Sequence, residues 1–375
     1  MIKRFLFLFP FIPMVLLLIG VTKSQGQNLN SDDITLDQKI GQMLMVGFHG
    51  FELDDQSHVV RDIREYYTGG VILFDYHVPE GSPNRNIDSP DQVKRLIEDL
   101  QNLTDQTLFV AVDQEGGRVA RLKEARGFPE NVSAQYLGDL NDEDVTRFYA
   151  SKMALTLNEL GFNVNFAPVV DLNTNPENPV IGQIERSFSA DPERVTRHAA
   201  IFLEEFSKQN IIGVLKHFPG HGSAWNDSHV GMADVTDTWD EIELEPYRQL
   251  VNSNIPFAVM TAHVFNEQLD AEYPATLSEN IQTVLLREQL GFEGVLFSDD
   301  MQMEAIRSFY GLETAVETAI LAGVDVLVFA NNSVYEPEII PELVQIIKNL
   351  IAEGVLTEER IDQSYNRIKR AKSGL

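Results

Sequence analysis

The feature that most constrains the fold of this chain is the alternation of eight short apolar runs with longer helical patterns. Most of the runs are continuously apolar, as expected of parallel strands that are buried on both faces. The expected strands span 43–48, 70–74, 108–113, 164–171, 213–218, 256–263, 294–299 and 324–330. Eight strand–helix units predict an α/β protein, a single-domain (β/α)8 TIM barrel, with an open doubly wound sheet as the alternative.

Capping residues set the expected helix boundaries. Asn141 is expected to cap a helix that stops at Gly161, and Asp191 precedes another. Ser278 is expected to cap a third helix. The helices expected toward the carboxyl end span 279–290, 338–352 and 357–372.

The amino terminus has the pattern of a secretory signal peptide. Lys3 and Arg4 precede an apolar run over 5–21, and small and polar residues follow. We expect a signal over about residues 1–26, cleaved to leave a catalytic domain over 27–375; an uncleaved membrane anchor is the alternative. The chain has no cysteine, which excludes a lipoprotein signal. The expected location is periplasmic or extracellular.

The balance of charge and the absence of cysteine exclude several functions. There are 57 acidic and 29 basic residues, giving a net charge of −28. Such a surface repels nucleic acid and anionic membranes, so we expect no nucleic-acid partner, and membrane contact only through an uncleaved signal. Thiolate chemistry and cysteine metal sites are excluded. We expect a monomer.

Polar residues gather where the expected strands end. Asp113 ends the third strand, Lys216 and His217 end the fifth, His263 the sixth and Asp299 the seventh. In a barrel the carboxyl ends of all strands meet at one face, where catalytic residues sit. These side chains are therefore predicted to share one site.

The segment K-H-F-P-G-H-G-S-A-W-N-D-S-H, residues 216–229, holds three histidines. His217 and His221 have a metal-ligand spacing, but Pro219 breaks any helix between them and no H-E-x-x-H is present, so metal is disfavoured. If the D-S-H triplet is extended, Asp227 and His229 face the same side, and the carboxylate can fix the imidazole tautomer for proton transfer. The alternative is an Asx turn with a surface histidine. No G-x-S-x-G motif supports a serine nucleophile.

Several motifs together resemble glycoside hydrolase family 3, in its β-N-acetylhexosaminidase branch. They are K-H-F-P-G-H-G with D-S-H, V-D-Q-E-G-G-R-V-A-R-L, E-R-S-F-S-A-D-P, V-M-T-A-H-V, A-T-L-S, L-L-R-E-Q-L-G-F-E-G-V-L-F-S-D-D-M and A-G-V-D-V-L. They occur in order over residues 35–373. The resemblance implies a retaining β-glycosidase with a barrel fold.

Catalytic roles follow from this resemblance. The nucleophile would be Asp299, kept ionised by Arg and Lys neighbours, while Asp300 would point the other way. The acid/base would be His229, oriented by Asp227. His221 would be structural.

The resemblance also assigns the residues that grip the hydroxyls of the terminal sugar: Asp113, Arg121, Arg186, Lys216 and His217. Two extra residues precede the E-R-S-F motif that contains Arg186. Trp225 is a candidate for stacking on a sugar face.

The implied function is exo-hydrolysis of terminal β-linked N-acetylglucosamine from peptidoglycan fragments or chitooligosaccharides. No cofactor and no metal are implied. Alternatives are a phosphorylase, since a histidine acid/base does not repel phosphate, a β-glucosidase of the same family, and a non-catalytic sugar-binding protein.

Overall fold

The computed structural model describes residues 34–229 and 231–375. The signal peptide expected over residues 1–26 lies outside them. Residues Thr35–Leu375 form one compact unit. In the described part of the chain, no helix is both long enough and apolar enough to cross a membrane.

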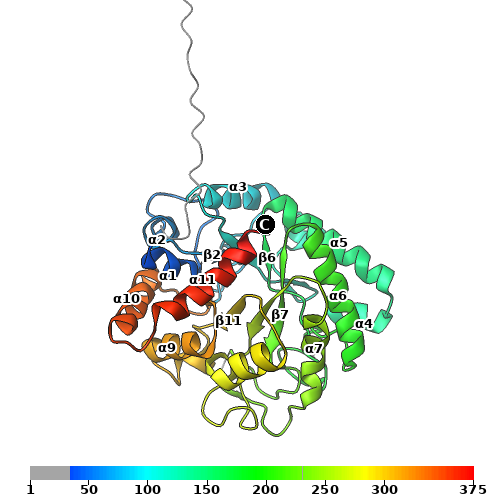
Figure 1. Ribbon diagram of the computed structural model, residues 1–375. Coiled ribbons are helices and arrows are strands. Elements are labelled where there is room, and N and C mark those ends of the chain that lie inside the picture. Colours follow the sequence, from blue (N-terminus) through cyan, green and yellow to red (C-terminus); the bar gives the residue numbers. More distant parts are fainter. Residues whose placement is uncertain (1–33, 230) are drawn as a thin grey trace, which may run out of the picture. The chain divides into compact units, whose positions relative to one another are not determined.

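Eight parallel strands close into a barrel (Figure 1). Strand β1 pairs with both β2 and β12, with Leu44 opposite Leu327. This closure confirms the predicted (β/α)8 barrel and excludes the open sheet, whose edge strands stay unpaired. Each strand overlaps one predicted run: β1 Leu44–Gly47, β2 Gly70–Ile72, β3 Phe109–Val112, β6 Val164–Asn165, β7 Ile212–Phe218, β9 Ala258–Thr261, β11 Leu296–Asp300 and β12 Val326–Phe329.

Aromatic side chains fill the barrel interior. The ring of Phe297 on β11 lies 6.0 Å from that of Phe109 on β3 and 5.5 Å from that of Phe166, centroid to centroid. All three are fully buried. The barrel is therefore a packed core, and ligands must bind at its ends.

Helices surround the barrel, and their ends test the capping predictions. Asp191 caps α6, and Gly161 ends α5 in the left-handed conformation, as expected. Thr357, where the last helix was expected to begin, is the N-cap of α11. The prediction for Asn141 is wrong: it ends α4 in that conformation, and Asp142 caps α5. The helices are α1 Leu36–Gln42, α2 His58–Tyr66, α3 Pro90–Gln101, α4 Ala134–Leu140, α5 Glu143–Leu160, α6 Pro192–Lys208, α7 Glu245–Val251, α8 Glu304–Arg307, α9 Leu312–Ala322, α10 Ile339–Ala352 and α11 Glu358–Lys372.

The helix predicted over 279–290 is present at Asn280–Gln289, where it winds as a π-helix. Its N-cap is Glu279 and not the predicted Ser278, whose hydroxyl accepts from the N–H of Ile281. Other short elements were not predicted from the sequence. Two small sheets form in the loops, β4 Gln114–Gly116 with β5 Val119–Ala120, and β8 Ala233–Asp234 with β10 Val264–Phe265. In the described part of the chain, 3-10 turns span Glu124–Arg126, Glu241–Leu244 and Ala275–Leu277.

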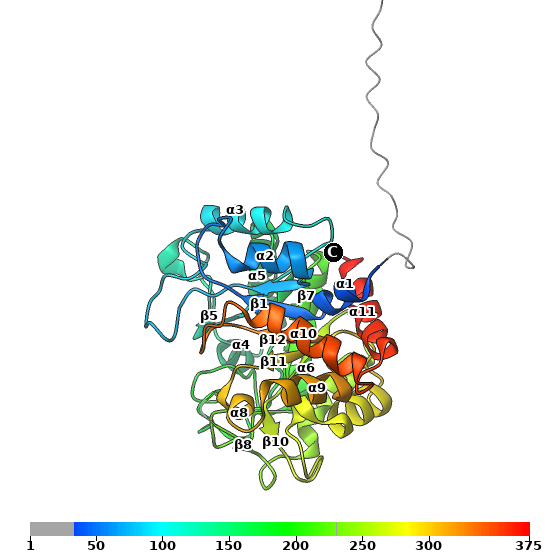
Figure 2. The same cartoon turned by 90° about the vertical axis from the view of Figure 1, so that its left-hand side faces the viewer.

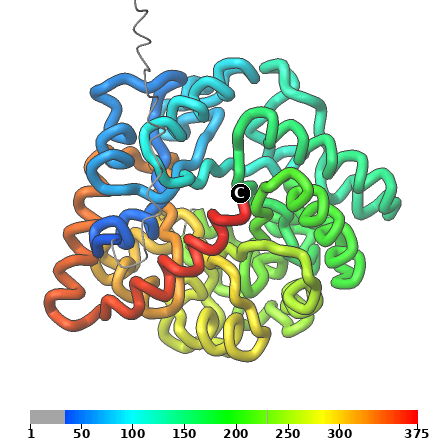
Figure 3. The backbone as a smooth tube through the Cα atoms, turned by 45° about the horizontal axis from the view of Figure 1, so that its top comes forward, coloured from blue at the N-terminus to red at the C-terminus, as the bar shows by residue number. Residues whose placement is uncertain are grey.

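The two ends of the barrel differ. Figure 1 looks onto the amino-terminal end, where α11 crosses in front of the strands, and Figure 3 shows α11 beside α1. Lys372 of α11 donates to the carbonyl oxygen of Gly69, which precedes β2. In Figure 2 the loops that carry β5, β8, β10 and α8 project from the opposite side. Those loops follow the strands and surround the carboxyl-terminal end.

Candidate active site

A pocket of about 390 Å³ opens at the carboxyl-terminal end of the barrel. It is lined by the eight residues that the sequence assigned to catalysis or sugar binding: Asp113, Arg121, Arg186, Lys216, His217, Asp227, His229 and Asp299. They come from the ends of β3, β7 and β11 and from the loops between strands. A larger cavity of about 540 Å³, among apolar side chains near the start of β7 and the end of α11, contains none of them. His263, which was also expected at this site, does not line the pocket, and its Nε2 lies 2.9 Å from the carbonyl oxygen of Asp300.

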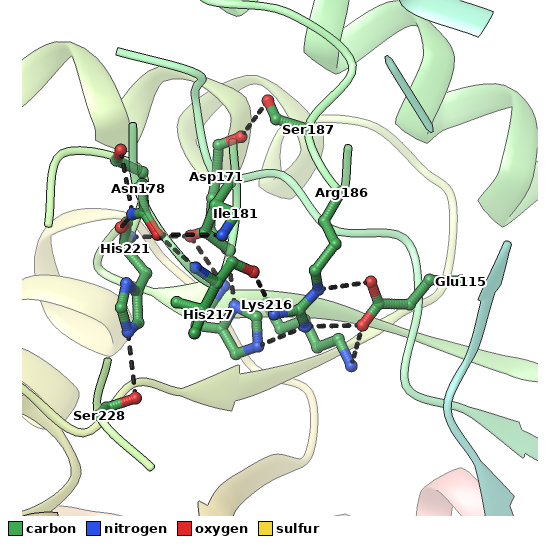
Figure 4. Close-up of polar contacts among 12 residues, drawn as sticks. Glu115, Asp171, Asn178, Ile181, Arg186, Ser187, Lys216, His217, His221 and Ser228 are labelled. Carbon is green, nitrogen blue, oxygen red and sulfur yellow. Dashed lines mark hydrogen bonds and ion pairs between the residues drawn. The ribbon is translucent and has the colours of Figure 1, made fainter. Parts of the chain in front are cut away.

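Two buried cations share one carboxylate in this pocket. Glu115 accepts from Arg186 through both its oxygens at 2.7 Å, and the Nζ of Lys216 lies 2.8 Å from Glu115 Oε1 (Figure 4). Burial alone would raise the pKa of Glu115, but Arg186 and Lys216 hold it below its usual value. The sequence prediction missed Glu115, which fixes both cations.

Asp113 completes this ion-pair network at the end of β3. Its Oδ1 accepts from Lys216 Nζ at 2.8 Å, and its Oδ2 lies 3.5 Å from Arg121. Burial opposes ionisation, yet Lys216 and Arg121 hold the pKa of Asp113 well below its usual range. Asp113 is therefore a permanent carboxylate that can accept hydrogen bonds from neighbouring hydroxyls of a ligand.

His217 is held as a neutral imidazole. Its Nδ1 lies 2.6 Å from Asp171 Oδ2, and its Nε2 lies 3.2 Å from a guanidinium nitrogen of Arg186. Burial, followed by the charges of Arg186 and Lys216, lowers the pKa of His217 well below its usual value. The proton is assigned to Nδ1, because Asp171 can only accept it and Arg186 can only donate to Nε2.

Asp227 and His229 form a pair at the pocket rim. Asp227 Oδ1 accepts from the backbone N–H of His229 at 2.8 Å and lies 2.7 Å from His229 Nδ1. The segment is a turn in which the Asp227 side chain accepts from the backbone N–H of His229, so the Asx-turn alternative is observed instead of the extended conformation. The turn brings the two side chains together and leaves that of His229 half exposed at the rim. Burial alone would lower the pKa of His229. The hydrogen bond to Asp227 and the charge of Asp299 outweigh burial, so the pKa of His229 lies above its usual value.

Asp299 lies at the end of β11, where the ladder to β12 is irregular. Burial raises its pKa, but His263, His217 and His229 hold the value below normal. Of these three, only His229 has a raised pKa of its own, while burial lowers the pKa values of His217 and His263. Arg and Lys neighbours were expected to keep Asp299 ionised, but the groups that lower its pKa are the three histidines and the backbone N–H of Asp300, which donates to Asp299 Oδ1 at 2.8 Å.

The neighbouring Asp300 has a different environment. Its Oδ1 accepts from the N–H groups of Gln302 and Ala330, at 3.0 and 3.1 Å. Burial raises the pKa of Asp300 to about 6. Its carboxylate is thus occupied by the backbone, although Asp300 also lines the pocket.

Two further residues and one insertion were singled out in the sequence. His221 is buried, does not line the pocket and contacts Ser228, consistent with a structural role. Trp225 is 61% exposed and is not part of the pocket lining, so nothing in the structure supports stacking on a bound sugar. The two extra residues before Arg186 leave it in the pocket and add Ile184 to the wall.

Glu243 is a buried carboxyl beneath the loop that carries Asp227 and His229. It is 1% exposed, and its Oε2 accepts from the N–H of Gly222 at 3.2 Å. Burial raises its pKa to about 8, whereas the unfolded group titrates near 4.5. Between these values the unfolded chain releases a proton that the folded chain keeps, so stability falls as the pH rises.

We expect Glu243→Gln to stabilise the fold at pH 7 by about 3 kcal/mol, because it removes this ionisation penalty and keeps an acceptor for Gly222. Thermal unfolding at pH 5 and pH 7.5 checks this: the gain should be larger at pH 7.5. Glu241→Gln, at an exposed neighbour, is the control. A gain that does not change with pH would show that Glu243 is ionised in the folded state.

A closed barrel whose strand ends gather ionised groups into one pocket has the arrangement of a barrel enzyme. The chain matches the family described as Glycosyl hydrolase family 3 N terminal domain over residues 35–371. It belongs to this family, as the sequence motifs indicated.

Individual relatives agree with this membership. Beta-hexosaminidase A of Pseudoalteromonas piscicida is 32% identical over 91% of this chain and 62% of its own length. A beta-hexosaminidase of Tolumonas auensis is 34% identical over 77% of this chain and 83% of its own. The structure of a glycoside hydrolase family 3 beta-N-acetylglucosaminidase from Paenibacillus sp. superposes with a TM-score of 0.83 at 34% identity, covering 91% of this chain and 62% of that one. The chain thus spans less than two thirds of the length of the Pseudoalteromonas and Paenibacillus proteins.

Proposed function

We propose that the protein is a retaining exo-β-N-acetylglucosaminidase that forms a covalent glycosyl-enzyme. The observation that carries this proposal is the presence of Asp299 and the Asp227–His229 pair in one pocket. The pKa of Asp299 is lowered and the pKa of His229 is raised. The names of the relatives support an N-acetylated amino sugar as the substrate.

In this mechanism, Asp299 is the nucleophile and His229 the acid/base. The carboxylate of Asp299 attacks the anomeric carbon while His229 Nε2–H protonates the leaving oxygen, and the glycosidic bond breaks. Nε2 then takes a proton from water, whose oxygen displaces Asp299 and releases the sugar with its configuration retained. Asp227 holds Nδ1–H and stabilises the imidazolium.

The ion-pair network would bind the terminal sugar. Asp113 is a permanent acceptor for vicinal hydroxyls, while Arg121 and Lys216 present donors beside it. Glu115 does not need to touch the sugar, because its part is to hold Arg186 and Lys216 in place.

The natural substrates are proposed from the expected location. Export through residues 1–26 would place the enzyme where peptidoglycan fragments or chitooligosaccharides are found. Cell fractionation and amino-terminal sequencing of the mature protein test the export. A full-length protein retained in the cytoplasm would contradict it.

The decisive experiment compares an aryl β-N-acetylglucosaminide with the matching β-glucoside, each with and without phosphate. We expect selective release from the N-acetyl substrate, with no acceleration by phosphate. Strong acceleration by phosphate would assign a phosphorylase, preference for the glucoside would assign a β-glucosidase, and absence of turnover would leave a sugar-binding protein.

A further inference from the structure

Ser228 lies between the two members of the proposed acid/base pair, but it faces the protein interior. It is 2% exposed, whereas the side chains of Asp227 and His229 are 29% and 54% exposed. The turn therefore sends one side chain inward and two toward the pocket. A serine hydroxyl buried this deeply requires a hydrogen-bond partner.

That partner is His221, whose Nε2 lies 3.1 Å from Ser228 Oγ (Figure 4). The segment that contains Asp227 and His229 makes few other polar contacts. Among residues 225–229 and 231–232, every other hydrogen bond and ion pair joins Asp227 to His229. Over these described positions, the Ser228–His221 contact is the one polar tether to the rest of the barrel.

The tether ends on a rigid support. The N–H of His221 donates to Asp171 Oδ1 at 2.8 Å, and its carbonyl accepts from Asn178 Nδ2 at 2.7 Å. Asp171, Asn178 and His221 are all buried. Asp171 also holds the imidazole of His217, which lines the pocket, so one carboxylate connects the tether to the sugar-binding side (Figure 4).

We propose that Ser228 is a positioning residue: its hydrogen bond to His221 sets the place of the Asp227–His229 pair relative to Asp299. This inference rests on the proposed function. Proton transfer requires the imidazole within hydrogen-bond reach of the leaving oxygen, and a misplacement of about 1 Å costs about 100-fold in rate. The described residues of this loop have one polar contact with the rest of the barrel, so the position of the pair depends on that contact.

The positioning role of Ser228 can be tested by comparing kcat/KM on substrates with poor and good leaving groups. Phenyl β-N-acetylglucosaminide needs protonation of its poor leaving group, whereas the 2,4-dinitrophenyl glycoside does not. In the full chain we expect Ser228→Ala to lower kcat/KM about 10- to 100-fold on the phenyl substrate. On the dinitrophenyl substrate the loss should be less than about threefold, because no general acid is needed for that bond to break.

Hydrogen–deuterium exchange of the peptide that contains residues 225–229 provides a readout that does not require turnover. Exchange should be faster in Ser228→Ala than in the wild type, and Ser228→Thr, which keeps the hydroxyl, should restore both exchange and the phenyl rate. Ser223→Ala is the matched control for loss of a buried hydroxyl from the same loop, because Ser223 lies beside Glu243 and does not bond His221. It should leave the leaving-group dependence unchanged.

The outcomes separate this inference from the proposed function. Equal losses on both substrates, or unchanged exchange in Ser228→Ala, would overturn the positioning role while the wild type remains active. A wild type that hydrolyses only β-glucosides would overturn the substrate assignment, and the same comparison on phenyl and dinitrophenyl glucosides would then decide the role of Ser228. A wild type that is inactive on all four substrates, with unchanged folding, would overturn both.

Discussion

Asp299→Ala is expected to lower kcat/KM on an aryl β-N-acetylglucosaminide at least about 1,000-fold, because the proposed mechanism has no other group that forms the glycosyl-enzyme. Adding sodium azide should restore turnover. The small anion can enter the space left by the carboxylate and attack the anomeric carbon from the same face. The product should therefore be the α-glycosyl azide, identified by nuclear magnetic resonance.

Asp300→Asn is the comparison that makes this result specific. It removes a neighbouring negative charge and keeps an acceptor for the N–H groups of Gln302 and Ala330. We expect a loss within about tenfold, since the proposed mechanism gives Asp300 no part in bond formation. A larger loss in Asp300→Asn than in Asp299→Ala would transfer the nucleophile to Asp300.

The barrel was predictable because its strands are continuous apolar runs, each of which carries its own signal. Helix ends were predictable where one capping residue stood alone, as at Asp191. Asn141 and Asp142 are adjacent, and either can cap a helix. The ability of asparagine to adopt the left-handed conformation decided between them, and it ended α4 before Asp142 opened α5.

The site was less predictable because its partners are distant in the chain. Glu115 meets Arg186 across 71 residues, and Asp171 meets His217 across 46. The sequence did hold a signal for Asp171. Asp171 ends the fourth predicted strand, so the strand-end rule that selected Asp113 applies to it equally. Glu115 lies in the Q-E-G-G-R motif, but nothing local shows that it would face two cations.

Glu115→Ala is expected to destabilise the fold by about 3–5 kcal/mol, because it leaves Arg186 and Lys216 buried with one counter-charge fewer. Urea unfolding followed by circular dichroism measures this. Glu124→Ala, at an exposed glutamate of the same segment, should change stability by no more than about 0.5 kcal/mol. Equal effects of the two substitutions would show that the Glu115 ion pairs do not stabilise the fold.

Glu115→Gln separates charge from shape at the same position. The amide keeps one acceptor oxygen, but its NH2 group faces a cation, so one of the two bonds to Arg186 is lost. The lowered pKa of Glu115 means that its contribution is present at neutral pH and is lost on acidification below about 4.5, where the unfolded group takes up a proton. The stability gap between wild type and Glu115→Gln should therefore narrow as the pH falls through this range. A stability difference that does not change with pH would mean that Glu115 acts through packing alone. The ion pairs with Glu115 would then not explain why Arg186 and Lys216 are fixed beside Asp113.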